Sequence, residues 1–280
     1  MPRANCLTLV VAALFALIAQ AGTAETQLKI FDAHLHYNQE PTPFYRLEQV
    51  LDVFRRNSVA GIIANSRPNK GTHELVNAKA QGLLVVPFIR PYRTRADVSD
   101  WSTDPSIYDL IESEYGRGYF RGVGEFHIYG EAAARPLVKK TVEFAAARNL
   151  YILAHCDEVA LTILLAHHAE ANIIWAHTGF STPVARVGEL LDRHPALLGE
   201  LSYRSGITEA NGQLSAEWRQ LFQRHSDRFL IGSDTWIDER WFAYDDIIKG
   251  YRDWLAQLPD DQAKRIAHGN AERLFGAKLE

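Results

Sequence analysis

Cysteine is nearly absent from this 280-residue chain, which contains two cysteines and one methionine. Cys6 lies in an N-terminal segment that we expect to be removed, so Cys156 is the one thiol of the mature chain and no internal disulfide can form. We interpret Cys156 as a small buried hydrophobic residue rather than a ligand. Such a chain must obtain its stability from an apolar core or from a bound metal.

The chain also lacks any block of like charge. Its 30 basic and 34 acidic residues give a net charge of −4, and no basic stripe argues for a nucleic-acid partner or a membrane surface. No glycine-rich phosphate turn follows the first apolar run, which disfavours an open dinucleotide-binding sheet. No linker or repeat divides the sequence, so residues 25–280 are predicted to form one domain.

A sustained apolar run occurs at the N-terminus, where Arg3 precedes residues 7–19. Small residues follow, with candidate cleavage sites at residues 19–21 and 22–24. This layout is typical of a secretory signal, and the run is too short for a comfortable membrane span. We predict a signal peptide at residues 1–24, export to the periplasm or the exterior, and no stable membrane association after cleavage. The alternative is an uncleaved anchor.

Strand-like and helix-like segments alternate along the rest of the chain. Short apolar runs are typical of parallel strands that are buried on both faces. Strands are expected at 27–36, 59–66, 83–89, 120–128, 150–156, 172–178, 196–203 and 228–235, and helices at 44–57, 72–81, 104–115, 135–149, 157–170, 181–194, 215–227, 245–258 and 260–275. Eight strand–helix units in about 250 residues predict a single (β/α)8 barrel with an extra C-terminal helix.

The first strand ends in Asp32-Ala33-His34-Leu35-His36. Because alternate residues of a strand share a face, Asp32, His34 and His36 are expected to point to one side. Two imidazoles on one face can bind one metal ion, but an isolated His-x-His pair is more often structural.

Metal-competent side chains recur at the ends of four further predicted strands. In such barrels the chemistry lies at the carboxyl ends of the strands. These positions hold Glu125 and His127, His155, His177, and Asp234. By strand alternation, His155 is expected on the same face as Leu153, His177 on the same face as Trp175, and Asp234 on the same face as Gly232, so each can point into the barrel. A nitrogen and oxygen ligand set suits zinc, with manganese, iron and nickel as further candidates, and suits magnesium less well.

Taken together, these motifs resemble the amidohydrolase superfamily of metal-dependent (β/α)8 hydrolases over nearly the whole mature chain. The segment Gly269-Asn270-Ala271-Glu272-Arg273-Leu274-Phe275 is similar to the C-terminal signature of the amidohydrolase-2 branch. Gly122-Val123-Gly124-Glu125 instead resembles the strand-four glutamate of TatD-like hydrolases, at a position where many other members of the superfamily have a carboxylated lysine.

The resemblance implies a role for each matching residue. His34, His36 and Asp234 would bind one metal ion. His155 and His177 would bind a second, with Glu125 bridging the two. Asp234 would also accept a proton from metal-activated water, a role that a neighbouring carboxylate can fill. A one-metal site would leave Glu125 and His177 as supporting residues, and Asp32 and Ser233 are candidates for orienting the ligands.

Substrate contacts are predicted from residues near the same strand ends. His127 could reach the cavity mouth, Arg90 and Arg204 could bind an anionic group, and Trp236 could form part of a pocket wall. The competing explanation is that the arginines are solvated loop residues and that Trp236 packs under a helix.

Three functions fit these observations. The first is an exported metal-dependent hydrolase that uses one or two divalent ions to act on a small-molecule amide, ester, lactone or phosphoester. The second is a mononuclear decarboxylase or hydratase of a carboxylated substrate, suggested by the C-terminal signature. The third is a non-catalytic binding protein, which the complete ligand set disfavours. The sequence leaves the substrate, the metal, the number of ions and the oligomeric state open.

Overall fold

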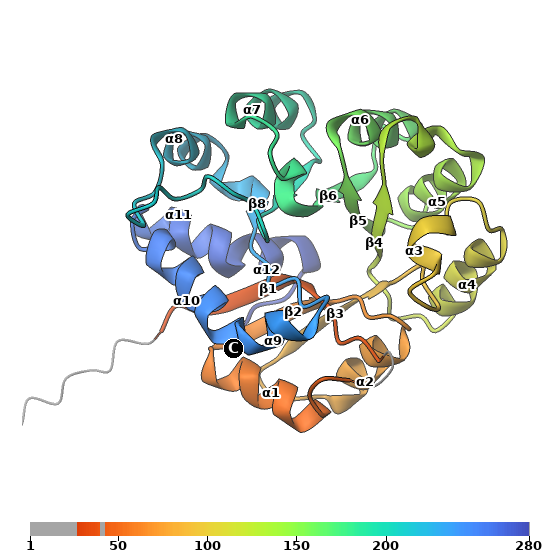
Figure 1. Ribbon diagram of the computed structural model, residues 1–280, viewed down its shortest axis with the longest axis horizontal. Coiled ribbons are helices and arrows are strands. Elements are labelled where there is room, and N and C mark those ends of the chain that lie inside the picture. The colour runs from red at the N-terminus through yellow and green to blue at the C-terminus, as the bar shows by residue number, and fades with distance from the viewer. Residues whose placement is uncertain (1–26, 40–42, 280) are drawn as a thin grey trace, which may run out of the picture.

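The computed structural model describes residues 27–39 and 43–279, so the predicted signal peptide lies outside the described residues. Eight parallel strands follow one another around a barrel in sequence order (Figure 1). They are β1 (Ile30–Leu35), β2 (Val59–Ala64), β3 (Leu84–Ile89), β4 (Gly122–Ile128), β5 (Tyr151–Cys156), β6 (Asn172–Trp175), β7 (Leu198–Glu200) and β8 (Phe229–Leu230). A parallel bridge between Asp32 and Ile231 connects the two ends of the sheet. The predicted (β/α)8 barrel is confirmed.

Helices surround the barrel and connect its strands (Figure 1). The long ones are α1 (Leu47–Arg56), α2 (Lys70–Ala78), α4 (Ser106–Tyr115), α5 (Pro136–Ala146), α6 (Glu158–His167), α7 (Val184–Arg193), α8 (Ala216–His225) and α10 (Tyr244–Leu255). Two short helices, α3 (Asp97–Asp100) and α9 (Asp238–Phe242), lie in loops where the sequence predicted none. Within the described residues, no helix is long and apolar enough to cross a membrane.

Two buried apolar clusters explain why both faces of the strands are hydrophobic. An inner cluster takes residues such as Ile63, Leu153 and Ile174 from the barrel interior. An outer cluster takes residues such as Cys156 and Trp175 and packs them against the helices. Burial on both faces is what a parallel sheet under a helical layer requires, and the outward position predicted for Cys156 is confirmed.

The C-terminal signature lies under the inner cluster. The predicted helix 260–275 is divided into α11 (Asp260–Lys264), the π-helical turn η4 (Arg265–Gly269) and α12 (Asn270–Phe275). The ring of Phe275 lies 5.8 Å from that of Phe31 and 5.1 Å from that of Tyr151. The Asn270 side chain donates hydrogen bonds to the carbonyls of Ser226 and Phe229. The signature therefore covers the amino-terminal end of the barrel, on the side away from the strand ends that carry His34 and His36.

The direction predicted for Asp32 is wrong. Phe31 and Ala33 belong to the inner cluster, whereas the Asp32 carboxylate accepts a hydrogen bond from Tyr244 Oη of α10, 2.8 Å away. The pairing of β1 with β2 is irregular between Asp32 and Leu35. This irregularity interrupts the alternation, so that His34 faces the barrel mouth although Asp32 does not.

Candidate metal centre

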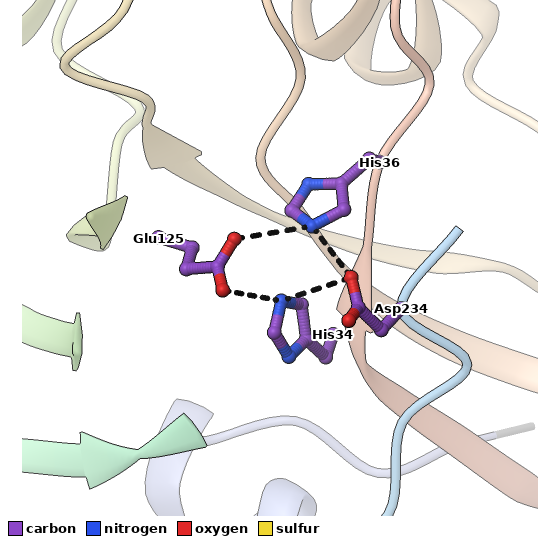
Figure 2. A group of neighbouring side chains, drawn as sticks. All are labelled: His34, His36, Glu125 and Asp234. Carbon is purple, nitrogen blue, oxygen red and sulfur yellow. Dashed lines mark ion pairs between the residues drawn. The ribbon is translucent and has the colours of Figure 1, made fainter. Parts of the chain in front are cut away.

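Four side chains from three parts of the barrel converge at its carboxyl-terminal mouth (Figure 2). His34 and His36 come from the end of β1, Glu125 from β4, and Asp234 from the loop after β8. His34 Nε2 lies 3.5 Å from both Glu125 Oε1 and Asp234 Oδ1. His36 Nε2 lies 3.4 Å from Glu125 Oε2 and 3.0 Å from Asp234 Oδ1. All four residues are buried, and one ligand atom from each lies within 4.8 Å of the others.

The geometry of this cluster fits a divalent metal ion. A tetrahedral site with metal–ligand bonds of roughly 2.1 Å separates its ligand atoms by about 3.4 Å. The four separations in the cluster, from 3.0 to 3.5 Å, are close to that value. Apart from the ion-pair contacts within the cluster, His34 Nε2 and Asp234 Oδ1 are buried without a hydrogen-bond partner among the described residues. Because a buried polar atom without a partner is costly, both atoms point to a bound cation.

A second group of possible ligands adjoins the first through Glu125. His155 Nδ1 lies 2.8 Å from Glu125 Oε1 and 3.2 Å from His177 Nε2. His177 Nε2 is 3.7 Å from the same carboxylate oxygen. The structure thus brings together all six residues that the sequence nominated as ligands, with Glu125 between the two groups. Whether one or two ions bind there stays a prediction.

Glu125 reaches the centre because β4 is irregular at Gly124. The pairing of β4 with β5 shifts between Gly124 and Phe126. Gly124 has φ +126°, and a Cβ atom on it would lie 2.2 Å from the carbonyl oxygen of Leu153. After this bulge, Glu125 and His127 point inward together, and His127 Nε2 lies 3.9 Å from Glu125 Oε1. Glycine is required here because other residues rarely adopt this conformation and have no room.

Left-handed turns place two of these candidate ligands, His177 and Asp234. His177 lies in the turn η2 (Ala176–Gly179) with φ +57°, and Thr178 follows with φ +44°. Trp175 points outward into the outer cluster. The prediction that His177 points to the same side as Trp175 is therefore wrong, because the left-handed turn directs the His177 side chain inward. Asp234 also has a positive φ, of +47°. The turn at His177 ends β6 earlier than the sequence predicted, since left-handed residues cannot continue a strand. β8 is also shorter than predicted and ends at Leu230, before the turn at Asp234.

The charges of the cluster compensate one another. Burial opposes ionisation of Asp234, but His34 and His36 outweigh it and lower the pKa of the Asp234 carboxyl to about 2. Burial likewise opposes the charge of Glu125, and His127, His34 and Arg90 hold its pKa well below its usual range. For His34, burial is outweighed by Asp234 and Glu125, which raise its pKa well above its usual range. Buried carboxylates thus require nearby positive charge, which a divalent cation also supplies.

Two supporting residues were not predicted from the sequence. Asn65 follows β2 and accepts hydrogen bonds on its side-chain oxygen from the Glu125 backbone N–H, 3.0 Å away, and from Arg90, 2.9 Å away. Its backbone carbonyl lies 2.6 Å from His36 Nδ1. Glu200, the last residue of β7, is fully buried with Oε2 2.9 Å from His34 Nδ1. A carboxylate inside an otherwise apolar strand was the sequence signal that could have revealed Glu200.

The predicted supporting residues, Asp32 and Ser233, act through the backbone. Asp32 Oδ1 accepts the backbone N–H groups of Ser233, 2.8 Å away, and of His34, 3.2 Å away. The backbone N–H of Asp234 donates to the His34 carbonyl at 2.6 Å. Asp32 therefore joins the two loops that carry His34 and Asp234.

A cavity of about 480 Å³ opens above the centre. Its lining includes Glu125, His155, His177, Asp234 and three of the four predicted substrate contacts, which are His127, Arg90 and Trp236. Burial lowers the pKa of His127 to about 3, so this imidazole is neutral near pH 7. Arg90 is buried and forms an ion pair with Glu125 Oε2 at 2.9 Å. It therefore supports a candidate ligand as well as lining the cavity.

Arg204 is the exception among the predicted substrate contacts. Its guanidinium donates to the carbonyl of Thr182 and lies 5.0 Å from the ring centroid of Trp218. It lines a neighbouring cavity between the loop after β7 and α10 rather than the cavity above the centre. The chain turns at Tyr203, which has φ +51°, and this turn separates Arg204 from the centre.

Comparisons with solved structures agree with the barrel. A zinc-bound amidohydrolase from Burkholderia multivorans aligns with TM-score 0.59 and 15% identity over 89% of this chain and 100% of that chain. A TatD homologue from Escherichia coli aligns with TM-score 0.62 and 13% identity over 90% and 99%. A probable 2-pyrone-4,6-dicarboxylic acid hydrolase from Acinetobacter baumannii, with citric acid bound, aligns with TM-score 0.58 and 15% identity over 89% and 99%. At these identities the likeness establishes a shared fold.

The sequence itself identifies the family. A comparison with curated proteins returns no match. The family model Amidohydro_2, described as amidohydrolase, matches residues 96–277, which is more than half of the chain. The match covers Glu125, His155, His177 and Asp234, and the buried cluster fits the divalent metals that this family uses. The chain therefore belongs to the amidohydrolase-2 family and is an enzyme of the amidohydrolase type.

Proposed function

We propose that this enzyme hydrolyses a carbonyl bond, in a lactone, ester or amide, of a small substrate that carries a carboxylate. The observation that carries the proposal is the convergence of His34, His36, Glu125 and Asp234 below a cavity whose wall contains arginines. Zinc is the ion we favour, because the ligands are imidazole nitrogens and carboxylate oxygens and because the amidohydrolase from Burkholderia multivorans binds zinc.

The chemistry divides between the ion and the protein. A divalent ion held by this cluster lowers the pKa of a water molecule and polarises a carbonyl oxygen. Asp234 lines the cavity as a carboxylate with a pKa of about 2, so near neutral pH it can accept a proton from the attacking water and return it to the leaving group. The neutral imidazole of His127 adds no charge to the cavity.

Charge around the cavity favours an anionic substrate. Arg90 and Arg95 line it, and the carboxylates among its described lining residues are those of Glu125 and Asp234. A bound divalent ion would offset those two carboxylates and leave the charge of the two arginines in excess. Among the described residues, the Arg95 guanidinium has no hydrogen-bond or ion-pair partner, so it can bind a substrate carboxylate. The dicarboxylic acid substrate named for the Acinetobacter baumannii hydrolase is consistent with this class.

The test compares matched substrates and variants. Purified enzyme is assayed on lactones or esters that carry a free carboxylate and on the same compounds with that carboxylate masked. We expect turnover of the free acids, loss of turnover after chelation, and restoration by zinc. Arg95→Gln should raise KM for the free acids roughly 10- to 150-fold and leave KM for the masked compounds unchanged, because one charged hydrogen bond contributes roughly 1.5–3 kcal/mol. Arg55→Gln on α1 is the control, since Arg55 is exposed and pairs with Asp52.

A mononuclear decarboxylase or hydratase is the second candidate. The observation in its favour is that the four-residue cluster can hold one ion by itself. The C-terminal signature that first suggested it now has a structural role under the barrel. Release of carbon dioxide, or addition of water to a carbon–carbon double bond, instead of carbonyl hydrolysis would favour this candidate.

We also propose that the enzyme is exported, on the basis of the charged, apolar and small-residue order of residues 1–24. Expression of the full chain in a bacterial host, followed by fractionation and N-terminal sequencing, tests this. Export predicts a product in the periplasm or medium that begins between residues 20 and 26. A full-length product in the cytoplasm would contradict it.

A further inference from the structure

Glu200 is a buried carboxylate to which none of the family motifs gives a role. It ends β7 with its side chain fully buried. A carboxylate in such a place is retained only where other groups compensate its charge. Its surroundings therefore indicate what it does.

The polar contacts of the Glu200 carboxylate are with hydrogen-bond donors. Oε1 accepts the backbone N–H of Ser202 at 2.5 Å. Oε2 accepts the hydroxyl of Ser202 at 2.8 Å and the backbone N–H of His177 at 3.2 Å, and it lies 2.9 Å from His34 Nδ1. Glu200 also forms a group of metal-ligand spacing with His34 and His177. Because both of its oxygens already accept hydrogen bonds, we assign it as an acceptor that orients its neighbours rather than as a ligand.

The two nitrogens of His34 therefore have different roles. Nδ1 faces Glu200, so it carries a proton and donates a hydrogen bond to the carboxylate. Nε2 faces Glu125 and Asp234, where it has no hydrogen-bond partner among the described residues, so it is the nitrogen that would bind a metal ion. The carboxylate behind the ring thus selects the tautomer that can bind a metal.

Glu200 also holds the turn that carries His177. Besides the bond to the His177 N–H, the backbone carbonyl of Glu200 accepts the Thr178 hydroxyl at 2.9 Å. His177 and Thr178 are both left-handed, a conformation that costs non-glycine residues energy and persists where neighbouring contacts fix it. Ser202, two residues further on, accepts His177 Nδ1–H on its carbonyl at 2.9 Å.

We propose that Glu200 is the positioning residue of the metal centre, orienting His34 and the His177 turn at the same time. It joins a histidine of the four-residue cluster to a histidine of the adjoining group, so one carboxylate sets the geometry of both. The proposal rests on the metal binding in the proposed function, and it concerns metal affinity rather than the reaction catalysed.

The substitution Glu200→Gln tests the proposal because glutamine keeps the size and shape of the side chain, but only one of its two terminal atoms can accept hydrogen bonds. In either orientation, its NH₂ group would face the N–H of Ser202 or the N–H groups of His177 and His34. We expect Glu200→Gln to weaken zinc affinity about 10- to 100-fold, measured by competition with a chelator. The visible spectrum of the cobalt(II)-loaded variant should change, because the orientation of His34 is relaxed, while saturating metal still restores the wild-type stoichiometry.

The matched control is Glu114→Gln. Glu114 of α4 is also buried and also contacts a histidine, with Oε2 2.7 Å from His73 Nε2, but it lies among the outer helices. This variant should leave zinc affinity and the cobalt spectrum unchanged, which separates a general loss of stability from a loss of positioning.

Two results would overturn the proposal. Zinc affinity within twofold of wild type in Glu200→Gln would show that Glu200 positions nothing, and loss of one bound ion at saturating metal would make it a direct ligand. If Glu200→Gln does not fold, Glu200→Asp is measured, and there we expect a several-fold loss because the carboxylate retracts from His34. Unchanged affinity in that variant would also overturn it. A wild-type protein that binds no metal would instead refute the proposed function.

Discussion

At the scale of single residues, the centre depends on positions where the backbone departs from regular structure. Gly124, with φ +126°, directs Glu125 inward, and the left-handed His177 and Asp234 bring their side chains to the mouth of the barrel. For residues other than glycine, such conformations cost on the order of 1–3 kcal/mol each and are concentrated at functional sites. Substitutions at these positions should therefore affect stability and metal binding together.

Gly124→Ala should lower the free energy of unfolding by about 2 kcal/mol or more, and it should weaken zinc binding. The added Cβ would meet the Leu153 carbonyl at 2.2 Å in a left-handed backbone. Gly118→Ala is the control, since Gly118 has φ +81° and a Cβ atom added there would have no described heavy atom within 4 Å. Urea unfolding should give a loss of about 1 kcal/mol there, with unchanged zinc affinity. Equal losses in the two variants would contradict the role assigned to Gly124.

For individual residues, the sequence predicted which side chains lie together at the barrel mouth, but it did not always predict the direction in which a side chain points. His34, His36, Glu125, His155 and Asp234 were found because barrel chemistry lies at strand ends. The directions of Asp32 and His177 could not be predicted, because bulges and left-handed turns interrupt the alternation on which parity depends. Glu200 was missed because a lone carboxylate within an apolar run matches no known motif.

At the scale of elements, the loop after β3 shows how a charged network shapes the cavity wall. Asp97, at the start of α3, accepts the backbone N–H groups of Arg93 and Thr94 and pairs with the Arg93 guanidinium at 2.8 Å. This network fixes the loop on which Arg95 reaches the cavity. The sequence predicted no helix here, because a four-residue helix is too short to produce a periodic pattern.

The pH dependence of this loop follows from the pKa of Asp97. Its hydrogen bonds with Arg93 lower that pKa below the ordinary 3.8, so the folded state binds fewer protons than the unfolded state. The stability that Asp97 contributes is complete above pH 4 and is lost as the pH falls through its folded-state pKa. Asp97→Asn should cost about 1–3 kcal/mol at pH 7 and progressively less towards pH 3.

Urea unfolding of wild type and Asp97→Asn across this pH range provides the measurement. Asp109→Asn on α4 is the control, because the exposed Asp109 has no ion-pair partner in the described part of the chain. A difference between wild type and Asp97→Asn that stays constant from pH 7 to pH 3 would contradict the assigned role.

At the scale of the whole molecule, the residues of the candidate metal centre and the C-terminal packing that stabilises the barrel lie at opposite ends of it. Alternating strands and helices were sufficient to predict eight parallel strands in sequence order, because few architectures bury eight two-faced apolar strands. The metal cluster lies at one end, and α12 covers the other. The C-terminal signature thus marks the family through packing rather than through a contact with substrate.

Phe275→Ala should demonstrate this separation. The ring lies within 6.3 Å of the rings of Phe31, Phe88 and Tyr151, and its partial burial makes a loss of about 2–3 kcal/mol reasonable. Thermal unfolding of the metal-free protein should show the loss, whereas zinc affinity should equal that of wild type. A large change in zinc affinity would connect the two ends of the barrel and contradict their separation.

The central claim is that His34, His36, Glu125 and Asp234 bind a divalent metal ion. Isothermal titration of the metal-free enzyme with zinc tests it most directly, with Asp234→Ala and His34→Ala alongside wild type. We predict at least one tight site in wild type, and loss of that site in both variants while their circular dichroism spectra match wild type. The absence of tight binding in wild type, or the same binding in the two variants, would contradict the claim.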